Sequence, residues 1–407
     1  MQVAIVGNGI AGTTTARFVG ERVPDAKITI YSREPYAYYS RPRLIDFIAG
    51  EAPLEGMPQY DAAWYEKRHI ETCLSCEVAS IDTAGKTLTL SSGQQHSYDV
   101  LVLATGANAF VPPIAGVEKK GVGTLRTLQD AVTLCQAAQC CDRIVVLGGG
   151  LLGLDTAISF IHFGTAVTVV EAQPWLLPRQ LDREGAAVLQ HMVESRGVRV
   201  ITDDLCLQVL GEEQVEGIRL KSGLELPACQ LVISAGVRAN IALAKQAGLA
   251  CNRGILVNER METSAPQVYA VGDCAEFNGN VWGIIPVALA QARVAASQIA
   301  GEVTTLYTDL VPSTTLQVGG IELTSIGEVN PVGEGFQEYR YADDAHAVYK
   351  KVVVRDGIVV GAIMFGDRSD LPAITRLVSQ KIDVTAVASR LVSSDFNVGD
   401  WLKSATA

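Results

Sequence analysis

The stretch Gly7-Asn8-Gly9-Ile10-Ala11-Gly12 lies between the apolar run Val3–Val6 and the helical pattern Ala11–Arg22. A GxGxxG sequence that joins a buried strand to a helix is typical of a turn that binds a dinucleotide. Its first glycine forms the tight turn, its second lets a pyrophosphate approach the backbone, and its third packs the helix on the strand. The N-terminus of the helix then attracts the phosphates. We therefore expect this stretch to bind a dinucleotide through Gly7, Gly9, Ala11 and Gly12.

A second turn of the same kind, Gly148-Gly149-Gly150-Leu151-Leu152-Gly153, follows the apolar run Ile144–Leu147. The next apolar run, Ala166–Val170, ends in Glu171. A carboxylate at this position binds the 2′- and 3′-hydroxyls of an adenosine ribose and repels a 2′-phosphate. The sequence therefore favours NADH over NADPH at this turn, although Arg179 could restore NADPH binding.

Asp155 lies in the first turn of the helix predicted over Leu152–Phe163. Its carboxylate either complements the helix dipole or contacts the nicotinamide carboxamide. Two dinucleotide-binding turns in one chain imply two dinucleotides. If one of them stays bound and the other diffuses in and out, electron transfer between the two is the natural function. The expected NADH contacts come from the second turn, its helix and the ends of nearby strands: Gly148, Gly150, Leu151, Leu152, Gly153, Asp155, Glu171 and Gly236.

Composition excludes several classes of protein. The chain has 407 residues, 48% of them hydrophobic and 19% charged, which is enough to bury a sizeable core. Its net charge of -11 argues against nucleic acid as the main partner, because phosphate contacts need Lys and Arg surfaces. No apolar stretch approaches the ~18 residues of a membrane span. We expect a soluble cytoplasmic protein in which the nine cysteines are mostly reduced rather than paired.

The order of apolar runs and helical patterns predicts an α/β fold with parallel sheets. We expect two Rossmann-like dinucleotide-binding domains, the second inserted in the first, because the strand predicted over Val268–Asp273 has no role in the second domain. From Leu306 the pattern changes, and Asp356-Gly357 indicates an antiparallel hairpin in a C-terminal α+β domain that closes with helices over Leu371–Ser379 and Val384–Val392. The predicted domains are 1–112 with 240–305, then 113–239, then 306–407.

Two further segments carry a resemblance to a known family. Leu101–Gly106 and Thr263–Ala275, together with the glycine turns, resemble the FAD-dependent pyridine nucleotide-disulfide oxidoreductases. Within that family, Glu34–Leu44 and Gly254–Asn258 are similar to NADH:rubredoxin reductases and to the flavin module of NADH-dependent nitrite reductases. The resemblance implies that the first turn binds FAD and the second NADH.

The resemblance also implies roles for single residues. The carboxylate of Asp273 would hold the FAD ribitol, and Arg41-Pro42 would lie beside the flavin unless Arg41 is simply a surface arginine. The contact to the adenosine ribose stays open among Ser32, Arg33 and Glu34, and Val78 is either an adenine contact or ordinary strand core. The full set of expected FAD contacts is Gly7, Gly9, Ala11, Gly12, Ser32, Arg33, Glu34, Arg41, Pro42, Val78, Ala104, Thr105, Gly106, Asp273, Gly283 and Ile284.

The cysteines are predicted to take no part in catalysis. Relatives with disulfide or peroxide chemistry keep a cysteine near the first helix or near the Arg41 stretch, and Ala37–Ile48 contains none. We interpret Cys73 and Cys76 as unpaired thiols in a strand, and Cys135, Cys140 and Cys141 as a helix face and its end. Cys274 is either a small buried side chain or a neighbour of the flavin.

The resemblance implies an enzyme that passes a hydride from NADH to FAD and then single electrons to a small redox protein, most simply rubredoxin. A ferredoxin, a flavodiiron protein or a nitrite-reductase partner is also compatible, as is a homodimer. No protein nucleophile or metal is needed, and Arg41 and Asp155 are expected near the reacting groups. Two alternatives are an electron-input subunit of a larger complex and a nucleotide sensor that transfers no hydride.

Overall fold

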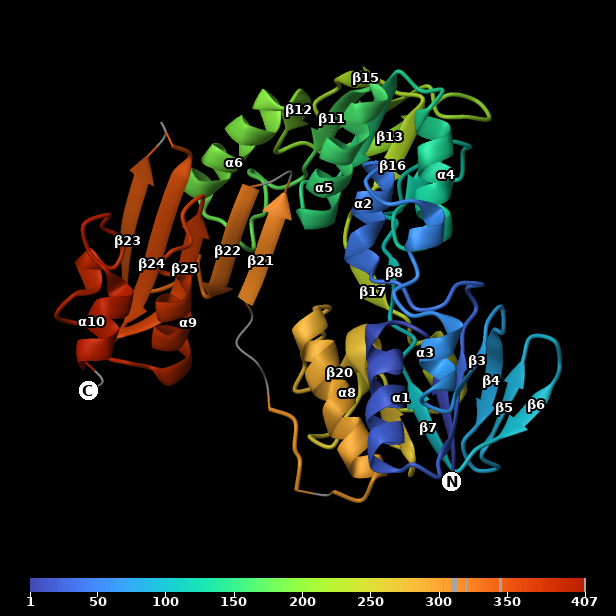
Figure 1. The fold of residues 1–407 in the computed structure, drawn as a ribbon. Helices are drawn as coiled ribbons and strands as arrows, with labels where there is room; N and C mark the ends of the chain where they lie inside the picture. The colour runs from blue at the N-terminus through green and yellow to red at the C-terminus, as the bar shows by residue number, and fades with distance from the viewer. Residues whose placement is uncertain (303, 309–312, 319–320, 344–345, 406–407) are drawn as a thin grey trace. The chain divides into compact units, whose positions relative to one another are not determined.

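The computed structural model describes residues 1–302, 304–308, 313–318, 321–343 and 346–405. The chain divides into two compact units, which are described separately (Figure 1). Unit 1 comprises Met1–Phe110, Arg126–Leu128 and Val237–Leu310. Unit 2 comprises Val111–Leu125, Gln129–Gly236 and Val311–Ala407, and so contains the second glycine turn together with the C-terminal region.

Unit 1 is built on a five-stranded parallel sheet in the order β19-β7-β1-β2-β3. These strands are apolar because both faces of the sheet are covered. Helices α1 (Ile10–Arg22) and α8 (Ile285–Ile299) lie side by side against one face (Figure 1). The strands are β1 (Gln2–Val6), β2 (Lys27–Tyr31), β3 (Ile70–Cys73), β7 (Val100–Leu103) and β19 (Val268–Ala270).

Smaller elements of unit 1 surround this sheet. An antiparallel sheet contains β4 (Val78–Asp82), β5 (Thr87–Leu90) and β6 (Gln95–Ser97). Two short pairs join β8 (Ala107–Ala109) with β17 (Val237–Ala239), and β18 (Ile255–Leu256) with β20 (Ala275–Glu276). The short helices are α2 (Leu44–Ile48), α3 (Ala62–Glu66) and α7 (Ala242–Gln246).

Unit 2 repeats the strand–turn–helix arrangement in a second five-stranded parallel sheet, in the order β12-β11-β10-β16-β9. Its strands are β9 (Val122–Thr124), β10 (Arg143–Leu147), β11 (Ala166–Val170), β12 (Val198–Ile201) and β16 (Gln230–Ile233). Helices α4 (Leu128–Ala138), α5 (Leu151–Ser159) and α6 (Arg183–Ser195) accompany it, with an antiparallel sheet of β13 (Cys206–Leu210), β14 (Gly217–Leu220) and β15 (Glu225–Pro227). The two parallel sheets bear out the predicted α/β class with two Rossmann-like folds.

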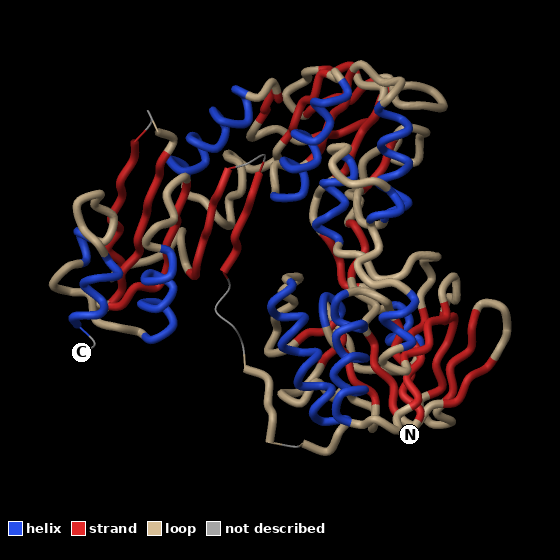
Figure 2. The backbone as a smooth tube through the Cα atoms, viewed as in Figure 1, coloured by secondary structure: helices blue, strands red, loops and turns tan. Residues whose placement is uncertain are grey.

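The C-terminal region of unit 2 forms an antiparallel sheet, whose strands are red in Figure 2. The order of these strands, which Figure 1 labels, is β21-β22-β25-β24-β23. The hairpin predicted at Asp356-Gly357 is present, and both turn residues have the positive φ angles, 52° and 75°, that this two-residue turn requires. The strands are β21 (Ser313–Val318), β22 (Ile321–Gly327), β23 (Phe336–Asp343), β24 (Val348–Arg355) and β25 (Ile358–Phe365). The segment between β21 and β22 lies outside the described residues.

The last two helices differ in part from the sequence prediction. The helix α9 (Leu371–Gln380) is present, but the helix predicted over Val384–Val392 is wrong, because that segment contains only a single 3-10 turn, Ala388–Arg390. Val384, Leu391 and Val392 are nevertheless buried in the same core as α9. Their apolar spacing therefore reflects burial of an irregular segment rather than helical periodicity. A further helix, α10 (Val398–Ala405), closes the described chain.

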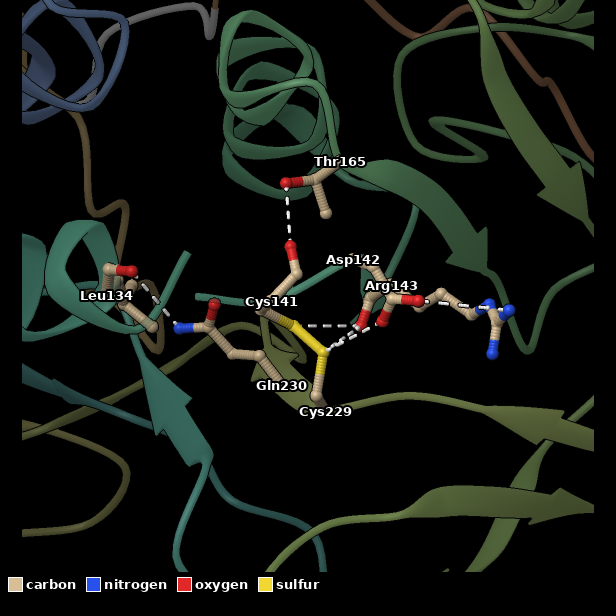
Figure 3. The surroundings of a disulfide bond; sticks show 7 residues. All are labelled: Leu134, Cys141, Asp142, Arg143, Thr165, Cys229 and Gln230. Atoms are coloured by element: carbon tan, nitrogen blue, oxygen red, sulfur yellow. Dashed lines mark hydrogen bonds and ion pairs between the residues drawn. A yellow bond between two sulfur atoms is a disulfide. The ribbon is translucent and has the colours of Figure 1, made fainter. Parts of the chain in front are cut away.

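The expectation of unpaired cysteines is wrong for four of the nine, because the structure contains two disulfides, Cys73–Cys76 and Cys141–Cys229. Cys141 precedes β10 and Cys229 precedes β16, so their bond joins the amino ends of two neighbouring parallel strands (Figure 3). Because 88 residues separate these two cysteines, only the pairing of the strands brings them together. Cys135, Cys140, Cys206, Cys251 and Cys274 are free.

Candidate functional site

The first and third glycines of each turn are required by the fold itself. Gly7 has a φ of 117°, and a Cβ atom there would lie 2.1 Å from the carbonyl oxygen of Ala104. A Cβ on Gly12 would lie 2.0 Å from the carbonyl oxygen of Gly7. Gly148 and Gly153 repeat this arrangement, with a φ of 115° at Gly148 and a 2.0 Å approach of a Gly153 Cβ to the Gly148 carbonyl. The tight strand-to-helix connection alone therefore requires these four glycines, and their presence is no evidence that a ligand binds.

The second glycine of each turn is different. Gly9 has a φ of -85° and Gly150 a φ of -77°, which any residue adopts. A Cβ on Gly9 would meet only the Arg41 Nη1 atom, at 3.3 Å, and one on Gly150 would meet nothing within 4 Å. Neither backbone strain nor protein packing requires a glycine here. The open space over both turns fits the close approach of a pyrophosphate to the backbone.

The first turn borders a cavity of about 500 Å³ in unit 1, at the carboxyl ends of the parallel strands. Such switch-point crevices are where open α/β sheets bind their ligands. Ten of the predicted FAD contacts line it: Gly7, Gly9, Ser32, Arg33, Glu34, Arg41, Val78, Ala104, Thr105 and Gly106. The other six, Ala11, Gly12, Pro42, Asp273, Gly283 and Ile284, are not among the lining residues.

Two arginines bring positive charge to this cavity. Arg41, at the start of a 3-10 turn over Arg41–Arg43, donates from Nε to the carbonyl oxygen of Arg126 over 3.1 Å. Arg126 also lines the cavity, and its Nη2 atom donates to Oδ2 of Asp273 over 2.7 Å. Asp273 is thus linked to the cavity through Arg126. Guanidinium groups suit the diphosphate of a dinucleotide because they present several donors in a fixed geometry.

The carboxylate of Glu34 is held by two neighbours. The Tyr39 hydroxyl donates to Oε2 over 2.5 Å, and Arg41 forms an ion pair with Oε1 at 3.5 Å. Burial, with the adjacent Glu34 charge, raises the pKa of Tyr39, so that its hydroxyl keeps the proton that it donates. The cavity is lined by all three candidates for the adenosine contact, Ser32, Arg33 and Glu34. The choice among them therefore stays open.

Sequence reasoning missed several of the residues that line the cavity. Arg126 lies in a loop outside any motif, and its position follows only from the return of the chain to unit 1 over Arg126–Leu128. The others are Val6, Asn8, Tyr31, Tyr36, Ala37, Tyr39, Cys76, Glu77, Ala79, Ala107, Asn108, Thr127, Asn240, Ala242, Leu243 and Gln246. The aromatic pattern Tyr36 to Tyr39, inside the segment that carried the resemblance, was the one signal that could have found some of them.

The Cys73–Cys76 disulfide borders the same cavity through Cys76. The backbone N–H of Ser32 donates to the Cys73 carbonyl over 2.9 Å, and the N–H of Cys76 donates to the Ser32 carbonyl over 2.8 Å. The disulfide therefore lies beside the carboxyl end of β2. Cys274 is fully buried, as expected of a small apolar side chain.

Around the second turn, Glu171 is mostly buried, and its carboxylate accepts two backbone hydrogen bonds. Oε2 accepts from the N–H of Gly149 over 2.6 Å and Oε1 accepts from the N–H of Gln173 over 2.7 Å. A carboxylate has about four acceptor positions, so these two hydrogen bonds leave about two of them for other donors. Gly236 has a φ of 94° and open space where a Cβ would stand.

The position of Asp155 requires a correction. Gly150 is the N-cap of α5, so Leu151 and Leu152 begin the helix, and its first turn contains no acidic residue. Asp155 therefore lies in the second turn, where the helix dipole has little effect on a carboxylate. Of the two interpretations of Asp155, the complement to the helix dipole is excluded on this ground.

Among the described residues, no helix is both long enough and apolar enough to cross a membrane.

Comparison with known proteins identifies the family. Residues 1–298 match the family model described as pyridine nucleotide-disulphide oxidoreductase, and residues 312–382 match the C-terminal domain of rubredoxin NAD+ reductase. Nitrite reductase [NAD(P)H] of Bacillus subtilis (strain 168) is 34% identical over 385 residues, which cover 94% of this chain and 48% of the relative. This chain thus spans about half the length of that relative.

Two relatives match over almost their whole length. The ferredoxin–NAD(+) reductase component of the biphenyl dioxygenase system of Paraburkholderia xenovorans (strain LB400) is 32% identical, covering 99% of this chain and 98% of the relative. NADH-rubredoxin oxidoreductase of Clostridium acetobutylicum is 30% identical, covering 90% and 93%. The crystal structure of the latter superposes with a TM-score of 0.81 at 27% identity, covering 95% of this chain and 97% of that one. The chain belongs to the pyridine nucleotide-disulphide oxidoreductase family, whose members bind FAD and NAD(P)H.

Proposed function

We propose that this chain oxidises NADH with a bound FAD and passes the electrons one at a time to a small electron-carrier protein, with rubredoxin the expected carrier. The observation that carries the proposal is the pair of glycines, Gly9 and Gly150, that neither conformation nor packing requires. Each leaves room for a pyrophosphate, so the chain has places for two dinucleotides. Bound FAD would supply the chemistry that accepts a hydride and releases single electrons.

The residues of unit 1 would bind FAD and orient it. Arg41 and Arg126 would face the diphosphate over the first turn, and Asp273, held by Arg126, would accept from ribitol hydroxyls. Ser32, Arg33 and Glu34 at the end of β2 would bound the adenosine half. Because Ala37–Ile48 contains no cysteine, we propose that electrons leave without a dithiol on that segment.

The residues of unit 2 would select NADH. The two free acceptor positions on Glu171 would bind the 2′- and 3′-hydroxyls of the adenosine ribose, and its charge would repel a 2′-phosphate. Asp155, in the second turn of α5, would lie on the nicotinamide side. Catalysis would be mainly a matter of holding the nicotinamide in a reactive position, because the reacting atoms belong to the cofactors.

The rubredoxin assignment is supported by the match of residues 312–382 to the C-terminal domain of rubredoxin NAD+ reductase. The alternative is an electron-input part of a larger assembly, which is supported by nitrite reductase relatives about twice as long as this chain. Under that alternative the electrons pass to another part of the same complex.

A single anaerobic experiment tests the proposal. NADH is mixed with the FAD-loaded chain in a stopped-flow instrument, and bleaching of the ~450 nm flavin band is expected. Rubredoxin, a ferredoxin and an artificial dye are then offered as acceptors. Reduction of rubredoxin supports the proposal, and reduction of the dye alone favours the larger assembly. A flavin band that NADH leaves unchanged would overturn the proposal in favour of a nucleotide sensor.

A further inference from the structure

A buried carboxylate connects the second nucleotide fold with the C-terminal sheet of unit 2. Asp182 ends the segment that follows Glu171, and its Oδ1 atom accepts from the N–H of Gly185 at the start of α6 over 3.0 Å. Its Oδ2 atom accepts from the Tyr349 hydroxyl over 2.7 Å and lies 3.0 Å from the Lys351 Nζ atom. Tyr349 and Lys351, both on β24, are each 1% exposed. Two lysines of the described part of this sheet, Lys350 and Lys351, are buried. Only Lys351 forms an ion pair with a residue of the nucleotide fold.

The segment between Glu171 and Asp182 closes over the glycine turn. The Leu177 N–H donates to the Gly149 carbonyl over 3.2 Å, and the Cδ2 atom of Leu176 would lie 2.4 Å from a Cβ on Gly149. Leu176 and Leu177 are buried, and Leu177 is held at a φ of 51°, which is uncommon for a leucine. The segment is therefore ordered by contacts at both ends rather than by its own conformational preference.

The C-terminal region also holds the middle of this segment. The Asn330 side-chain amide donates to the carbonyl oxygens of Pro178 and Leu181, over 3.0 Å and 2.9 Å. Arg340, on β23, adds a longer contact to Asp182, from Nε to Oδ2 at 3.4 Å. The segment between Glu171 and Asp182 is thus held at one end by its backbone hydrogen bond to Gly149 and at the other end by residues of the C-terminal region.

We infer that Tyr349 and Lys351 are positioning residues for NADH, acting through Asp182 on the segment that bounds the adenosine-ribose site. The inference rests on the proposed binding of NADH at the second turn. The Lys351 ammonium group is buried between two carboxylates, Asp182 at 3.0 Å and Glu338 at 2.9 Å. Because a buried ammonium group must keep its partners, Lys351 holds Asp182 in one place. A segment that is already ordered binds its ligand more tightly than one that must first become ordered. The C-terminal domain would therefore set the affinity for NADH without touching it.

Lys350 offers a matched control. It is the neighbour of Lys351 on β24, is 3% exposed, and points to the opposite face of the sheet. Its Nζ atom lies 2.6 Å from Asp367 and 3.2 Å from Asp370, both just before α9. Loss of either lysine removes an ion-pair partner from two carboxylates, Asp182 and Glu338 for Lys351 and Asp367 and Asp370 for Lys350, but only Lys351 contacts Asp182. The two variants therefore separate an effect on the NADH site from general damage to the sheet.

The test compares Lys351→Met with Lys350→Met in the FAD-loaded chain. Calorimetric titration with NADH should show a Kd raised roughly 3- to 30-fold by Lys351→Met and changed less than about 2-fold by Lys350→Met. In steady state, Lys351→Met should raise KM for NADH while kcat at saturating NADH stays within about 2-fold. Equal effects of the two variants, or an unchanged Kd in Lys351→Met, would overturn the inference.

Two milder variants keep the test decisive if Lys351→Met does not fold. Tyr349→Phe deletes one hydroxyl, and Asp182→Asn keeps a good N-cap for α6 while removing the charge opposite Lys351. Both should raise the Kd for NADH, and unchanged affinity in both would overturn the inference. If the unmodified chain binds no NADH, the proposed function fails as well. If it binds NADH and these variants bind it equally well, only the inference fails.

Coupling of this kind is reciprocal, which provides a readout independent of turnover. Binding of NADH to the unmodified chain should slow hydrogen exchange at Leu176–Leu181 and also in β24. In Lys351→Met the protection of β24 should be lost while protection around Gly149 remains. Protection of β24 that persists unchanged in Lys351→Met would contradict the proposed connection.

Discussion

The Nη2 atom of Arg126 lies 2.7 Å from the Oδ2 atom of Asp273, although 147 residues separate them. Both side chains are about one-fifth exposed, so this ion pair is far less screened by water than a surface pair. Arg126 lines the cavity over the first glycine turn, whereas Asp273 follows β19. The pair connects Asp273, to which the family resemblance gives the ribitol contact, with Arg126, which no motif indicated.

Replacement of Arg126 by Met should therefore weaken FAD binding. A charge-assisted hydrogen bond contributes about 1.5–3 kcal/mol, so the Kd for FAD should rise roughly 10- to 150-fold. Titration of apoprotein with FAD measures the change. Arg22→Met is the control, because Arg22 forms an ion pair with Glu302 in unit 1 and does not line the cavity. A variant at Arg126 that retains FAD as well as the Arg22 variant would contradict this role.

Alanine at Gly150 and at Gly153 should have opposite consequences. The added methyl on Gly150 meets nothing within 4 Å, so the variant should fold normally, keep its FAD and lose affinity for NADH at least about 10-fold. The methyl on Gly153 would lie 2.0 Å from the Gly148 carbonyl, so that variant should unfold at a lower temperature. Thermal unfolding and NADH titration of both proteins test this. A Gly150→Ala protein with normal NADH affinity would show that the second turn binds no pyrophosphate.

Replacement of Glu171 by Gln should change the choice between NADH and NADPH. The neutral side chain no longer repels a 2′-phosphate, so the ratio of kcat/KM for NADPH to that for NADH should rise roughly 10-fold. Steady-state rates with each nucleotide give the ratio. Glu194→Gln, at an exposed position on α6, should leave it unchanged. Equal use of both nucleotides by the unmodified protein would contradict the ribose argument.

The two disulfides predict a definite count of reactive thiols. Unfolded protein that has not been reduced should react at five cysteines, and reduced protein at nine. Replacing Cys141 and Cys229 together by serine should lower the free energy of unfolding by about 2–4 kcal/mol, because the bond closes a long loop. Thiol titration and urea unfolding measure the two effects. Nine reactive thiols without reduction would show that neither bond forms.

Acid should weaken the ion pair between Asp367 and Lys350. The hydrogen bond from Lys350, followed by that from the Ser369 backbone, lowers the pKa of Asp367 from 3.8 to about 2. A carboxyl group with a lowered pKa in the folded state stabilises above its unfolded pKa, and this contribution is lost as pH falls from about 4 to about 2. Asp367→Asn should therefore lose less stability than the unmodified protein between pH 5 and pH 3.

Urea unfolding at these two pH values measures the difference. Asp395→Asn is the matched control, since Asp395 is exposed in the same region of the chain. An Asp367→Asn protein as acid-sensitive as the control would show that the ion pair contributes nothing to the pH dependence.

Much of the fold could be predicted from sequence because its signals are local. The strand, glycine turn and helix at Val3–Arg22 lie within one short stretch, and the hairpin at Asp356-Gly357 depends on two adjacent positive φ angles. The helix predicted over Val384–Val392 failed for a related reason. Apolar residues recur there because the segment is buried against α9 and the sheet, and burial alone does not specify a helix.

The two strand–glycine–helix turns could be predicted from the sequence alone, because each needs only a few neighbouring residues and its own backbone geometry. Three contacts depend on the three-dimensional packing of the chain: Arg126 with Asp273, Cys141 with Cys229, and Lys351 with Asp182. Each of these contacts joins residues far apart in the chain. The order of the strands and the packing of the chain select these partners, and neither can be predicted from a local pattern of side chains.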